Sequence, residues 1–500
     1  MRIAISYPPI INSHGQKAMI SQNRNVQYFK TPTYLLPVVQ AQAATWLAEK
    51  GHDVYWDDGN AQLKTLREWQ NDLISFNPDV VLFESTTPVM HFYWELTRTL
   101  KTVIPEVIII FSGYHSLRKP EETLDNSAAD AVVLSSHIDF VMVRLCGYIS
   151  EHQLDWRETC DTEGLLIRLP DNTCRFTAKA RLTEDLSLSP VINRDLVRWR
   201  DYARENGNFL QIPGTYATSV IRDCTYGKCT FCRYNGPGTA VSVMPVSKSL
   251  DEYEFLINQL RVREIFDDSG VWYHGSTARQ FAEGIISRGL HKRKCYFGCN
   301  TRFEYMDEET IRILAAANWR FILIGLEAAD EETLTRLNKG YTLERLECCL
   351  EWFKKYGIHT HLTTMVGYYW QTEAQVKELV RTVRRYLFKG LIRTMQATIC
   401  TPLDFTPYHN ECIEQGVLCT DNYDHHDMSR IIVKTPAPHT VYYRAIATLY
   451  RSAFHPRFVL RQLLFLFSCR KRDWQFVFLY GLRAVRRVRN HLFNLTRGVT

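Results

Sequence analysis

Short apolar runs alternate with amphipathic stretches over residues 1–150. The runs Val80–Phe83, Val107–Phe111 and Ala131–Leu134 are rich in β-branched residues and have the length of buried strands, whereas Leu36–Lys50 has the length and spacing of a helix. Strands that alternate with helices in this way predict a parallel sheet with helices on both faces. We therefore expect a doubly wound α/β domain here, with ligands bound beyond the carboxyl ends of its strands.

The alternation weakens in residues 151–213, which we expect to form a linker. A hairpin is predicted within it, because Gly164–Arg168 and Thr173–Phe176 flank a turn-forming Pro-Asp-Asn triplet. Further on, strand and helix patterns alternate again. The predicted strands are 217–222, 263–268, 295–301, 320–327, 358–367 and 393–400. Strands separated by helices predict a partial, TIM-like (β/α)6 barrel over residues 214–400, with its active site at the carboxyl ends of the strands.

Residues 401–500 are predicted to be helical, and their end carries the positive charge of the chain. Residues 451–500 contain eleven Lys and Arg and one acidic residue, Asp473, whereas the whole chain has a net charge of +6. Arginine is interleaved there with Phe, Leu, Val and Trp. Such basic helices either lie on an anionic membrane or an acidic partner, or pack on the barrel with a solvated basic face. We expect no nucleic-acid binding, because no recognised motif accompanies the charge.

Composition indicates a globular protein of a reducing compartment. Hydrophobic residues make up 45% of the chain and charged residues 23%, and 14 cysteines in 500 residues are too few for a disulfide scaffold. The apolar run at the N-terminus is too short for a signal peptide, and no stretch reaches the length of a membrane span. We therefore expect a cytoplasmic protein whose contact with a membrane is at most peripheral.

Cys224, Cys229 and Cys232 form a C-x4-C-x2-C cluster directly after a predicted strand. Thiolates are soft ligands, so three close together suit zinc or an iron–sulfur cluster. A structural zinc site normally has a fourth Cys or His at similar spacing, and the local sequence has none. Three ligands with one open coordination position favour a [4Fe–4S] cluster, with structural zinc as the alternative. The other cysteines of the barrel are expected to be buried apolar residues: Cys295, Cys299, Cys348 and Cys349.

The cysteine loop and the segments after it resemble the radical S-adenosylmethionine (SAM) enzymes. The matching segments are Asn235–Gly238, Asp267-Asp268, Asn338-Lys339-Gly340 and Thr401-Pro402. The usual spacing in the family is C-x3-C-x2-C, so this loop has one residue more between its first two cysteines. The resemblance implies that a reduced [4Fe–4S] cluster on Cys224, Cys229 and Cys232 cleaves SAM to a 5′-deoxyadenosyl radical. It also implies an electron donor such as flavodoxin or ferredoxin.

The same resemblance implies SAM contacts for five residues. Phe231 would lie against the adenine. Asp267 and Asp268 would approach the amino group of SAM. Arg302 and Glu327 would reach its carboxylate and ribose. Other roles stay open for three of the five, because the two aspartates could cap the following helix and Glu327 could be a solvated strand end.

No G-x-G-x-x-G motif follows the first strand, so a dinucleotide site is not expected there. The order of Tyr7-Pro8-Pro9, Leu47–Val54, Asn77–Val81 and Ser112–His115 resembles the cobalamin-binding domain that precedes the barrel in many radical SAM enzymes. Ser135–Asp139 stands where that domain usually has a Gly-Glu-Gly-Glu-like turn, and no D-x-H-x-x-G motif occurs in this domain. The resemblance therefore implies cobalamin bound without a histidine on its cobalt. A domain that binds nothing is the alternative.

The sequence thus predicts four parts: a cobalamin-binding-like domain (1–150), a linker (151–213), a radical SAM barrel (214–400) and a helical basic region (401–500). The predicted activity is cobalamin-dependent transfer of methyl from SAM to an unactivated carbon of a small or lipid-like substrate. One alternative is an enzyme of the same architecture that cyclises or rearranges a tetrapyrrole or lipid without methyl transfer. The other is a non-catalytic iron–sulfur redox or metal sensor.

Overall fold

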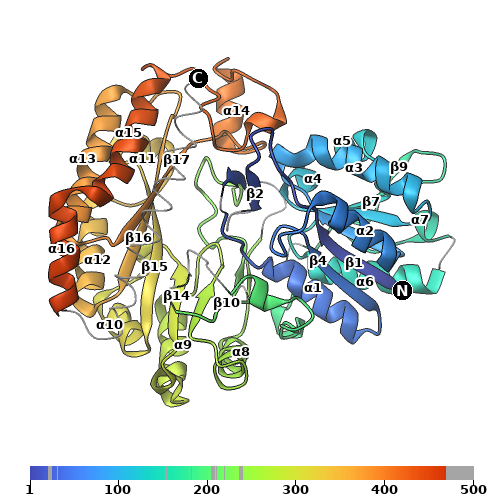
Figure 1. The fold of residues 1–500 in the computed structure, drawn as a ribbon, viewed down its shortest axis with the longest axis horizontal. Helices are drawn as coiled ribbons and strands as arrows, with labels where there is room; N and C mark the ends of the chain where they lie inside the picture. The colour runs from blue at the N-terminus through green and yellow to red at the C-terminus, as the bar shows by residue number, and fades with distance from the viewer. Residues whose placement is uncertain are drawn as a thin grey trace.

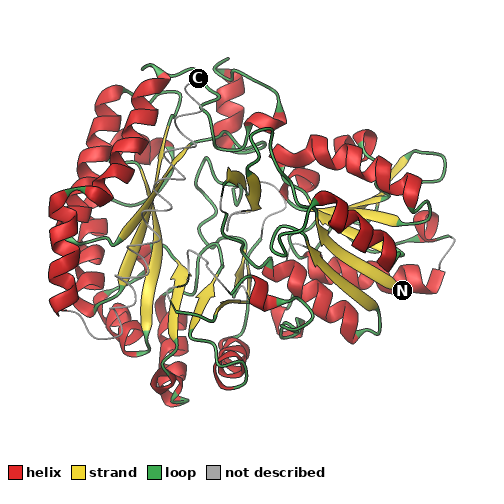
Figure 2. Cartoon of the chain, in the orientation of Figure 1, coloured by secondary structure: helices red, strands yellow, loops and turns green. Residues whose placement is uncertain are grey.

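The computed structural model describes residues 1–468 with short gaps, and Figures 1 and 2 show the arrangement of the helices and strands. The positions outside the described residues are 21–24, 31, 153–154, 182, 204–208, 210, 219, 236–239 and 469–500. The last of these stretches contains most of the predicted basic tail. Two large sheets lie side by side, the N-terminal one on the right of Figure 1 and the barrel sheet on its left. Of the helices in the described part, none is long and apolar enough to cross a membrane.

The first sheet has seven strands in the order β4-β1-β5-β6-β7-β8-β9. They are β1 (Arg2–Tyr7), β4 (Asp53–Asp58), β5 (Val80–Glu84), β6 (Ile108–Ser112), β7 (Ala131–Val133), β8 (Leu165–Arg168) and β9 (Cys174–Phe176). The first five strands in this order are parallel, as predicted, so their carboxyl ends share one edge. β8 and β9 form the predicted antiparallel hairpin, and β8 pairs antiparallel with β7. The first sheet therefore continues beyond residue 150 into the stretch predicted as a linker.

Helices cover both faces of this sheet. They are α1 (Val38–Glu49), α2 (Leu66–Phe76), α3 (Met90–Val103), α4 (Tyr114–Arg118), α5 (Pro120–Asn126), α6 (Ile138–His152) and α7 (Trp156–Thr159). In β5, Leu82 packs in a core with α1 and α6, whereas Val81 and Phe83 pack in a second core with α2 and α3. A parallel strand covered on both sides buries alternate side chains in two cores, which explains the continuous apolar runs of the sequence.

A separate two-stranded hairpin, β2 (Lys17–Ile20) with β3 (Val26–Phe29), follows β1 and lies between the two large sheets (Figure 1).

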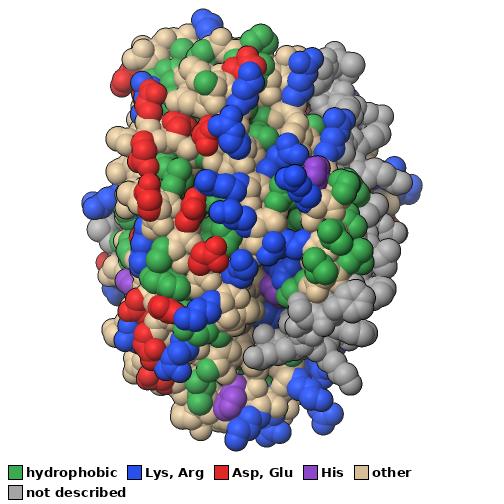
Figure 3. All heavy atoms as spheres, turned by 90° about the vertical axis from the view of Figure 1, so that its left-hand side faces the viewer, with side chains coloured by type: hydrophobic (Ala, Val, Ile, Leu, Met, Phe, Trp, Pro, Cys, Tyr) green, Lys and Arg blue, Asp and Glu red, His purple; other side chains and the backbone are tan. Residues whose placement is uncertain are grey.

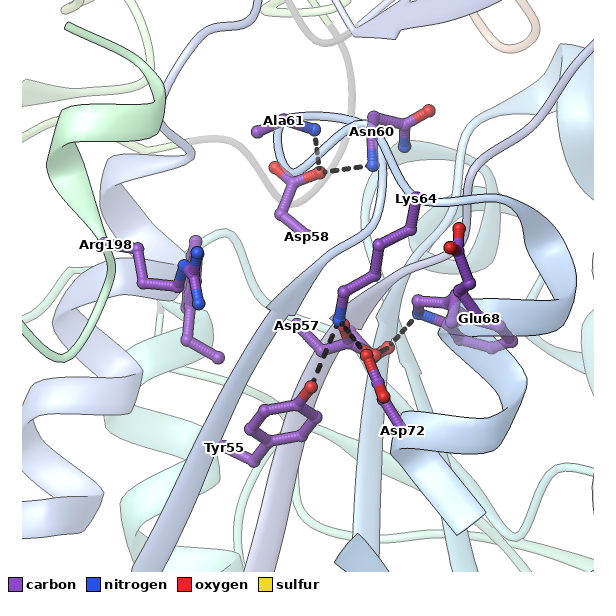
Figure 4. Close-up of polar contacts among 12 residues, drawn as sticks. Tyr55, Asp57, Asp58, Asn60, Ala61, Lys64, Glu68, Asp72 and Arg198 are labelled. Carbon is purple, nitrogen blue, oxygen red and sulfur yellow. Dashed lines mark hydrogen bonds and ion pairs between the residues drawn. The ribbon is translucent and has the colours of Figure 1, made fainter. Parts of the chain in front are cut away.

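A polar cluster lies at the carboxyl end of β4. In the cluster, the Lys64 ammonium lies 2.7 Å from Asp57 Oδ1 and 2.8 Å from Asp72 Oδ2 (Figure 4). Burial raises the pKa of Asp57 to about 6, and the Lys64 charge opposes that rise. The cluster holds the carboxyl end of β4 in place.

The second sheet has six parallel strands in the order β10-β13-β14-β15-β16-β17. They are β10 (Gly214–Ala217), β13 (Glu264–Asp267), β14 (Tyr296–Asn300), β15 (Trp319–Glu327), β16 (His359–Val366) and β17 (Thr394–Ile399). Five lie where the sequence predicts them. The first barrel strand comes earlier than the predicted 217–222, because the backbone N–H of Thr218 turns to the Glu252 carboxylate. Within 217–222, Ala217 ends β10, and Ile221–Arg222 form β11, which pairs antiparallel with β12 (Ser242–Val243).

Helices cover the outer face of this barrel sheet and continue to the end of the described chain. Those between the strands are α8 (Val246–Asn258), α9 (Gly275–Ser287), α10 (Glu308–Ala316), α11 (Glu331–Arg336), α12 (Leu343–Tyr356) and α13 (Glu373–Lys389). The C-terminal helices are α14 (Pro407–Glu414), α15 (His439–Arg451) and α16 (Pro456–Ser468). α15 and α16 lie over α13 on the outer side of the barrel (Figure 1). The chain is thus an α/β protein with a doubly wound sheet, a partial (β/α)6 barrel and a helical C-terminal region.

A buried ion pair joins the two sheets at the start of the cysteine loop. The two guanidinium nitrogens of Arg222 lie 3.0 Å from the two carboxylate oxygens of Asp139, at the beginning of α6. Arg222 also donates to the side-chain carbonyl of Gln42 in α1. Both charged side chains are almost completely buried. Because neither charge has access to water, each depends on the other for compensation.

We predict that Asp139→Asn lowers the stability of the protein by about 3–5 kcal/mol, because it leaves a buried guanidinium without its counter-charge. Urea unfolding followed by circular dichroism measures the change. Asp195→Asn is the matched control, since Asp195 pairs with Arg200 on the surface, where their side chains are 82% and 67% exposed. The control should lose less than about 1 kcal/mol. Equal losses in the two variants would contradict the role assigned to the buried pair.

Candidate functional site

The cysteine loop leaves β11 through a left-handed residue and is held at its far side by the chain after α11. Asp223 has a φ of 62°, which turns the chain immediately before Cys224. The backbone N–H of Thr230 donates to the carbonyl of Leu337 at 3.1 Å. The Tyr226 hydroxyl donates to the carbonyl of Asn338 at 2.6 Å. The loop is therefore fixed between β11 and the start of the segment that leads to α12.

The three thiols lie within electrostatic reach of one another. Burial, together with the charges of Cys229 and Cys224, raises the pKa of Cys232 to about 12. Burial also raises the pKa of Cys229. Thiols of this kind are protonated at neutral pH, and metal binding is what displaces their protons. Among the described side chains, no group of three or more His, Cys, Asp or Glu is arranged around a single ion. A cluster whose irons are each bound by a different cysteine fits this donor set.

Two cations stand beside Cys229. The Arg302 guanidinium donates to Cys229 Sγ at 3.8 Å, and its carbon lies 3.6 Å from the centre of the Tyr226 ring. The Lys339 ammonium is buried and lies 3.6 Å from Glu327 Oε1. Both positive charges act to lower the pKa of Cys229, against the effect of burial. Arg302 also forms an ion pair with Glu304, so each of the two cations beside Cys229 has a carboxylate counter-charge of its own.

Glu327 reaches this neighbourhood through an unusual backbone. Its φ is 66°, in the left-handed region, and its carboxylate folds back over Gly325. A Cβ at Gly325 would lie 2.2 Å from Glu327 Oε1, so a larger residue there would require the carboxylate to move. Burial raises the pKa of Glu327, and the Lys339 charge opposes that rise. The Phe231 ring centre lies 5.8 Å from the same ammonium.

The structure brings three of the five predicted SAM contacts together and separates the other two. Phe231, Arg302 and Glu327 all lie around Lys339 and Cys229. Asp267 is instead fully buried, accepts a hydrogen bond from the backbone N–H of Ser269 at 2.9 Å, and has its pKa raised to about 7 by burial. Its neighbours include Tyr253 of α8 and Cys299 of β14. Asp268 lines a cavity on the other side of the loop.

That cavity, of about 110 Å³, lies between the carboxyl edge of the first sheet and the cysteine loop. Glu84 and Gly113, at the predicted carboxyl ends of β5 and β6, line it. Its other walls come from the start of α1 (37–40), from Tyr114, Leu117 and Arg118, from Ser135, Ser136 and Ile138, and from Ile221–Asp223, Arg233, Tyr234, Asp268 and Gly270. The cavity therefore connects the ligand-binding edge of a doubly wound sheet with the residues next to Cys232.

An aromatic ring links the two sides of this cavity. The guanidinium carbon of Arg233, the residue after Cys232, lies 5.1 Å from the centre of the Tyr114 ring. That of Arg118 lies 5.5 Å from the same ring. The Tyr114 hydroxyl donates to the carbonyl of Asp404 at 2.6 Å, beyond β17. Tyr114 thus contacts the first sheet, the cysteine loop and the C-terminal segment.

Partly exposed side chains alternate along the last three barrel strands. They are Leu323 and Gly325 in β15, His361 and Thr363 in β16, and Gln396 and Thr398 in β17. Their neighbours Ile324, Leu362 and Ala397 pack in the core under the helices. Because side chains alternate across a strand, the partly exposed set faces the barrel interior. This face offers uncharged hydrogen-bonding groups and one histidine.

Sequence reasoning missed Lys339, Tyr226, Tyr114, Arg118 and Arg233 as site residues. Lys339 stands in a segment that carries the family resemblance, and Arg233 follows Cys232 directly, so these two had a local signal. The others reach the site through the packing of segments far apart in the chain. Neither spacing nor periodicity identifies such residues.

Comparison with known proteins places these features in a family. Residues 218–406 match the model of the radical SAM superfamily. An uncharacterized methyltransferase of Pyrococcus horikoshii is 22% identical over 77% of this chain and 80% of its own length. The anaerobic magnesium-protoporphyrin IX monomethyl ester cyclase of Cereibacter sphaeroides is 23% identical over 73% of this chain and 58% of its own length.

A solved structure shares the fold over almost the whole chain. It is the radical SAM methyltransferase TsrM of Kitasatospora setae with cobalamin and a [4Fe–4S] cluster bound, with a TM-score of 0.65 and 15% identity over 98% of this chain and 99% of that one. The likeness confirms the fold predicted from the sequence. Residues 218–406 of this chain therefore form a domain of the radical SAM superfamily, within a chain that has the overall fold of TsrM.

Proposed function

We propose that this radical SAM enzyme is a cobalamin-dependent methyltransferase that acts on an unactivated carbon of a small or lipid-like molecule. The observation that carries the proposal is the cavity that joins the carboxyl edge of the first sheet to the cysteine loop. A cofactor at this edge would lie next to a cluster on the loop. The relatives named as methyltransferases support the same activity.

In this proposal Cys224, Cys229 and Cys232 hold a [4Fe–4S] cluster, which supplies the electron that cleaves SAM. Arg302 and Lys339 place two positive charges beside Cys229, where they stabilise the anionic cluster and attract the carboxylate of SAM. Their buried position strengthens both effects, because little water screens the charges.

The remaining predicted contacts divide between two sides of the loop. Phe231 and Glu327 lie on the side of the two cations and are proposed to bind the adenine and ribose of SAM. Asp268 lies on the cavity side, where its carboxylate can meet the amino group. Asp267 is proposed to stabilise the core between β13 and α8 instead, because its carboxylate is fully buried away from the thiols.

Cobalamin, which supplies the carrier for the methyl group, is proposed to bind at the cavity. Serine hydroxyls, the carboxylates of Glu84, Asp223 and Asp268, and three arginines line the space, and these hydrogen-bonding groups suit the amide side chains of a corrin. The enclosed volume of about 110 Å³ is below the roughly 300 Å³ that a drug-sized ligand requires. The loops that end β6 and β7 must therefore move outward when the cofactor binds.

The proposal includes three partners. The uncharged interior face of β15, β16 and β17 suits a substrate recognised by shape and neutral hydrogen bonds. A flavodoxin or ferredoxin is proposed as the electron donor for the cluster. The basic C-terminal region is proposed to contact a membrane peripherally.

The activity is tested by the products of SAM. Protein purified without oxygen and reconstituted with iron, sulfide and hydroxocobalamin is incubated with SAM and a reductant, and the products are measured by mass spectrometry. We predict both 5′-deoxyadenosine and S-adenosylhomocysteine, since radical formation and methyl transfer consume SAM in different ways. If only 5′-deoxyadenosine forms, the proposed methyl transfer is wrong, and a cyclisation or rearrangement like that named for the cyclase relative takes its place. If neither 5′-deoxyadenosine nor S-adenosylhomocysteine forms, the proposal that this protein is an enzyme is overturned.

The cluster ligands are tested one at a time. Ala at position 224, 229 or 232 removes a thiolate that the chain does not replace, so each variant should lose the brown absorbance of the cluster and both SAM products. Cys348→Ala is the matched control, because Cys348, which was predicted to be buried, is exposed on the outer face of α12. It should retain full iron content. An alanine variant at any of the three positions that kept its cluster would remove that residue from the ligand set.

Cobalamin binding is tested by filling the cavity. Leu117→Trp adds an indole to the cavity wall and should reduce the cobalamin that remains bound after gel filtration by at least about ten-fold, since a ligand cannot displace a packed side chain without strain. The visible spectrum of the corrin gives the bound amount. Leu188→Trp is the control, because Leu188 is 62% exposed and does not line the cavity. Equal binding by both variants would place cobalamin elsewhere.

A further inference from the structure

The last described helix presents apolar side chains to solvent. α16 is attached to α13 on one side, where the Arg461 guanidinium donates to the carbonyl of Phe388 at 3.0 Å. On its other side Val459, Leu460 and Leu463 are 43%, 58% and 48% exposed. Residues three and four positions apart share a helix face, so these three form one continuous apolar ridge. An exposed ridge of aliphatic side chains marks a surface that another apolar phase covers.

The surroundings of this apolar ridge are strongly cationic. Arg457 of α16, Arg444 and Arg451 of α15, and Lys389 at the end of α13 are exposed. Within the described part of the chain, none of these four forms an ion pair with a carboxylate. The sequence has no acidic residue between Asp427 and Asp473. Figure 3, which views this side of the molecule, shows Lys and Arg side chains gathered beside hydrophobic ones.

We propose that the apolar ridge and the cations around it bind the surface of a membrane that contains anionic lipids. α16 would lie in the plane of the interface, with Leu460 and Leu463 among the acyl chains and the arginines at the head groups. Long basic side chains reach the head groups while their stems cover apolar surface. This inference rests on the peripheral membrane contact of the proposed function and on no step of its chemistry.

Two other partners could cover the apolar ridge: a second copy of the chain, or the tail at residues 469–500. Charge favours a membrane over both. A second copy of the chain in a two-fold dimer would place this cationic face against itself. The tail at residues 469–500 contains eight Lys and Arg and one acid, so it would meet the face with a charge of the same sign. The tail also contains aromatic residues of the kind enriched at membrane–water interfaces: Trp474, Phe476, Phe478 and Tyr480.

The experiment measures cosedimentation of the full-length protein with vesicles of phosphatidylcholine, with or without phosphatidylserine. The wild type should bind only vesicles that contain phosphatidylserine, and the binding should weaken as salt is raised. Leu460→Asp with Leu463→Asp should weaken it about ten-fold or more, because two leucines leave the lipid phase. Arg444→Glu with Arg451→Glu should also weaken it, and should remove the preference for phosphatidylserine.

Leu188→Asp with Val191→Asp is the matched control, because it replaces two exposed aliphatic residues of the 151–213 stretch, and it should bind as the wild type does. Equal binding to both vesicle types, or wild-type binding by the double leucine variant, would overturn the proposal. A dimer in sedimentation equilibrium that the leucine variant abolishes would assign the ridge to a second copy. All variants should retain wild-type SAM cleavage, so failure of membrane binding is distinguishable from failure of the proposed chemistry.

Discussion

The buried pair of Arg222 and Asp139 is the constraint on which the site depends. It fixes the residue that enters the cysteine loop to the beginning of α6, on the carboxyl side of β7. The carboxyl edge of the first sheet and the segment that follows β13 are thereby held against one cavity. Separating the pair would leave two buried charges without compensation. The relative position of the two sheets is therefore set by electrostatics as well as by packing.

Given that constraint, the cysteine loop has two electrostatically different sides. On one side Arg302 and Lys339 stand beside Cys229, with Glu327 as the counter-charge of the lysine. On the other side Arg233 and Arg118 stack on Tyr114 at the edge of the first sheet. A cluster between them would be approached by SAM from one side and by a second cofactor from the other. Asp268, which lines the cavity and is proposed to meet the amino group of SAM, would then lie where the two cofactors meet.

The extra residue of the C-x4-C spacing has a structural explanation. Tyr226 lies between the first two cysteines, covers the Arg302 guanidinium and donates to the carbonyl of Asn338. The additional length therefore reaches the segment after α11 and positions a cation that contacts Cys229. The spacing alone predicted the cluster, but nothing in it indicated that a tyrosine would hold the arginine in place.

Prediction from sequence succeeded where a local pattern has one structural solution. The continuous apolar run of β5 belongs to a strand covered on both faces, and five of the six barrel strands were placed by similar runs. Prediction from sequence failed where the orientation of a side chain decides whether it enters the core or the site. Asp267 ends β13 and is buried in the core, whereas Asp268, the residue after the strand, lines the cavity. Which side of β13 becomes the core and which the cavity depends on the packing of the helices and of the first sheet. The identity of the two aspartates does not determine this.

The barrel interior and the outer face of the molecule differ in charge. The interior face of β15, β16 and β17 carries threonine, glutamine and histidine, so a substrate bound there would meet no strong field of one sign. The cations lie on α15 and α16, on the outer side of the barrel (Figure 1). Surface charge of this kind acts over about one Debye length, roughly 8 Å, and so influences what the outer face meets rather than what the cavity binds. An apolar substrate held near a membrane would suit both halves of this arrangement.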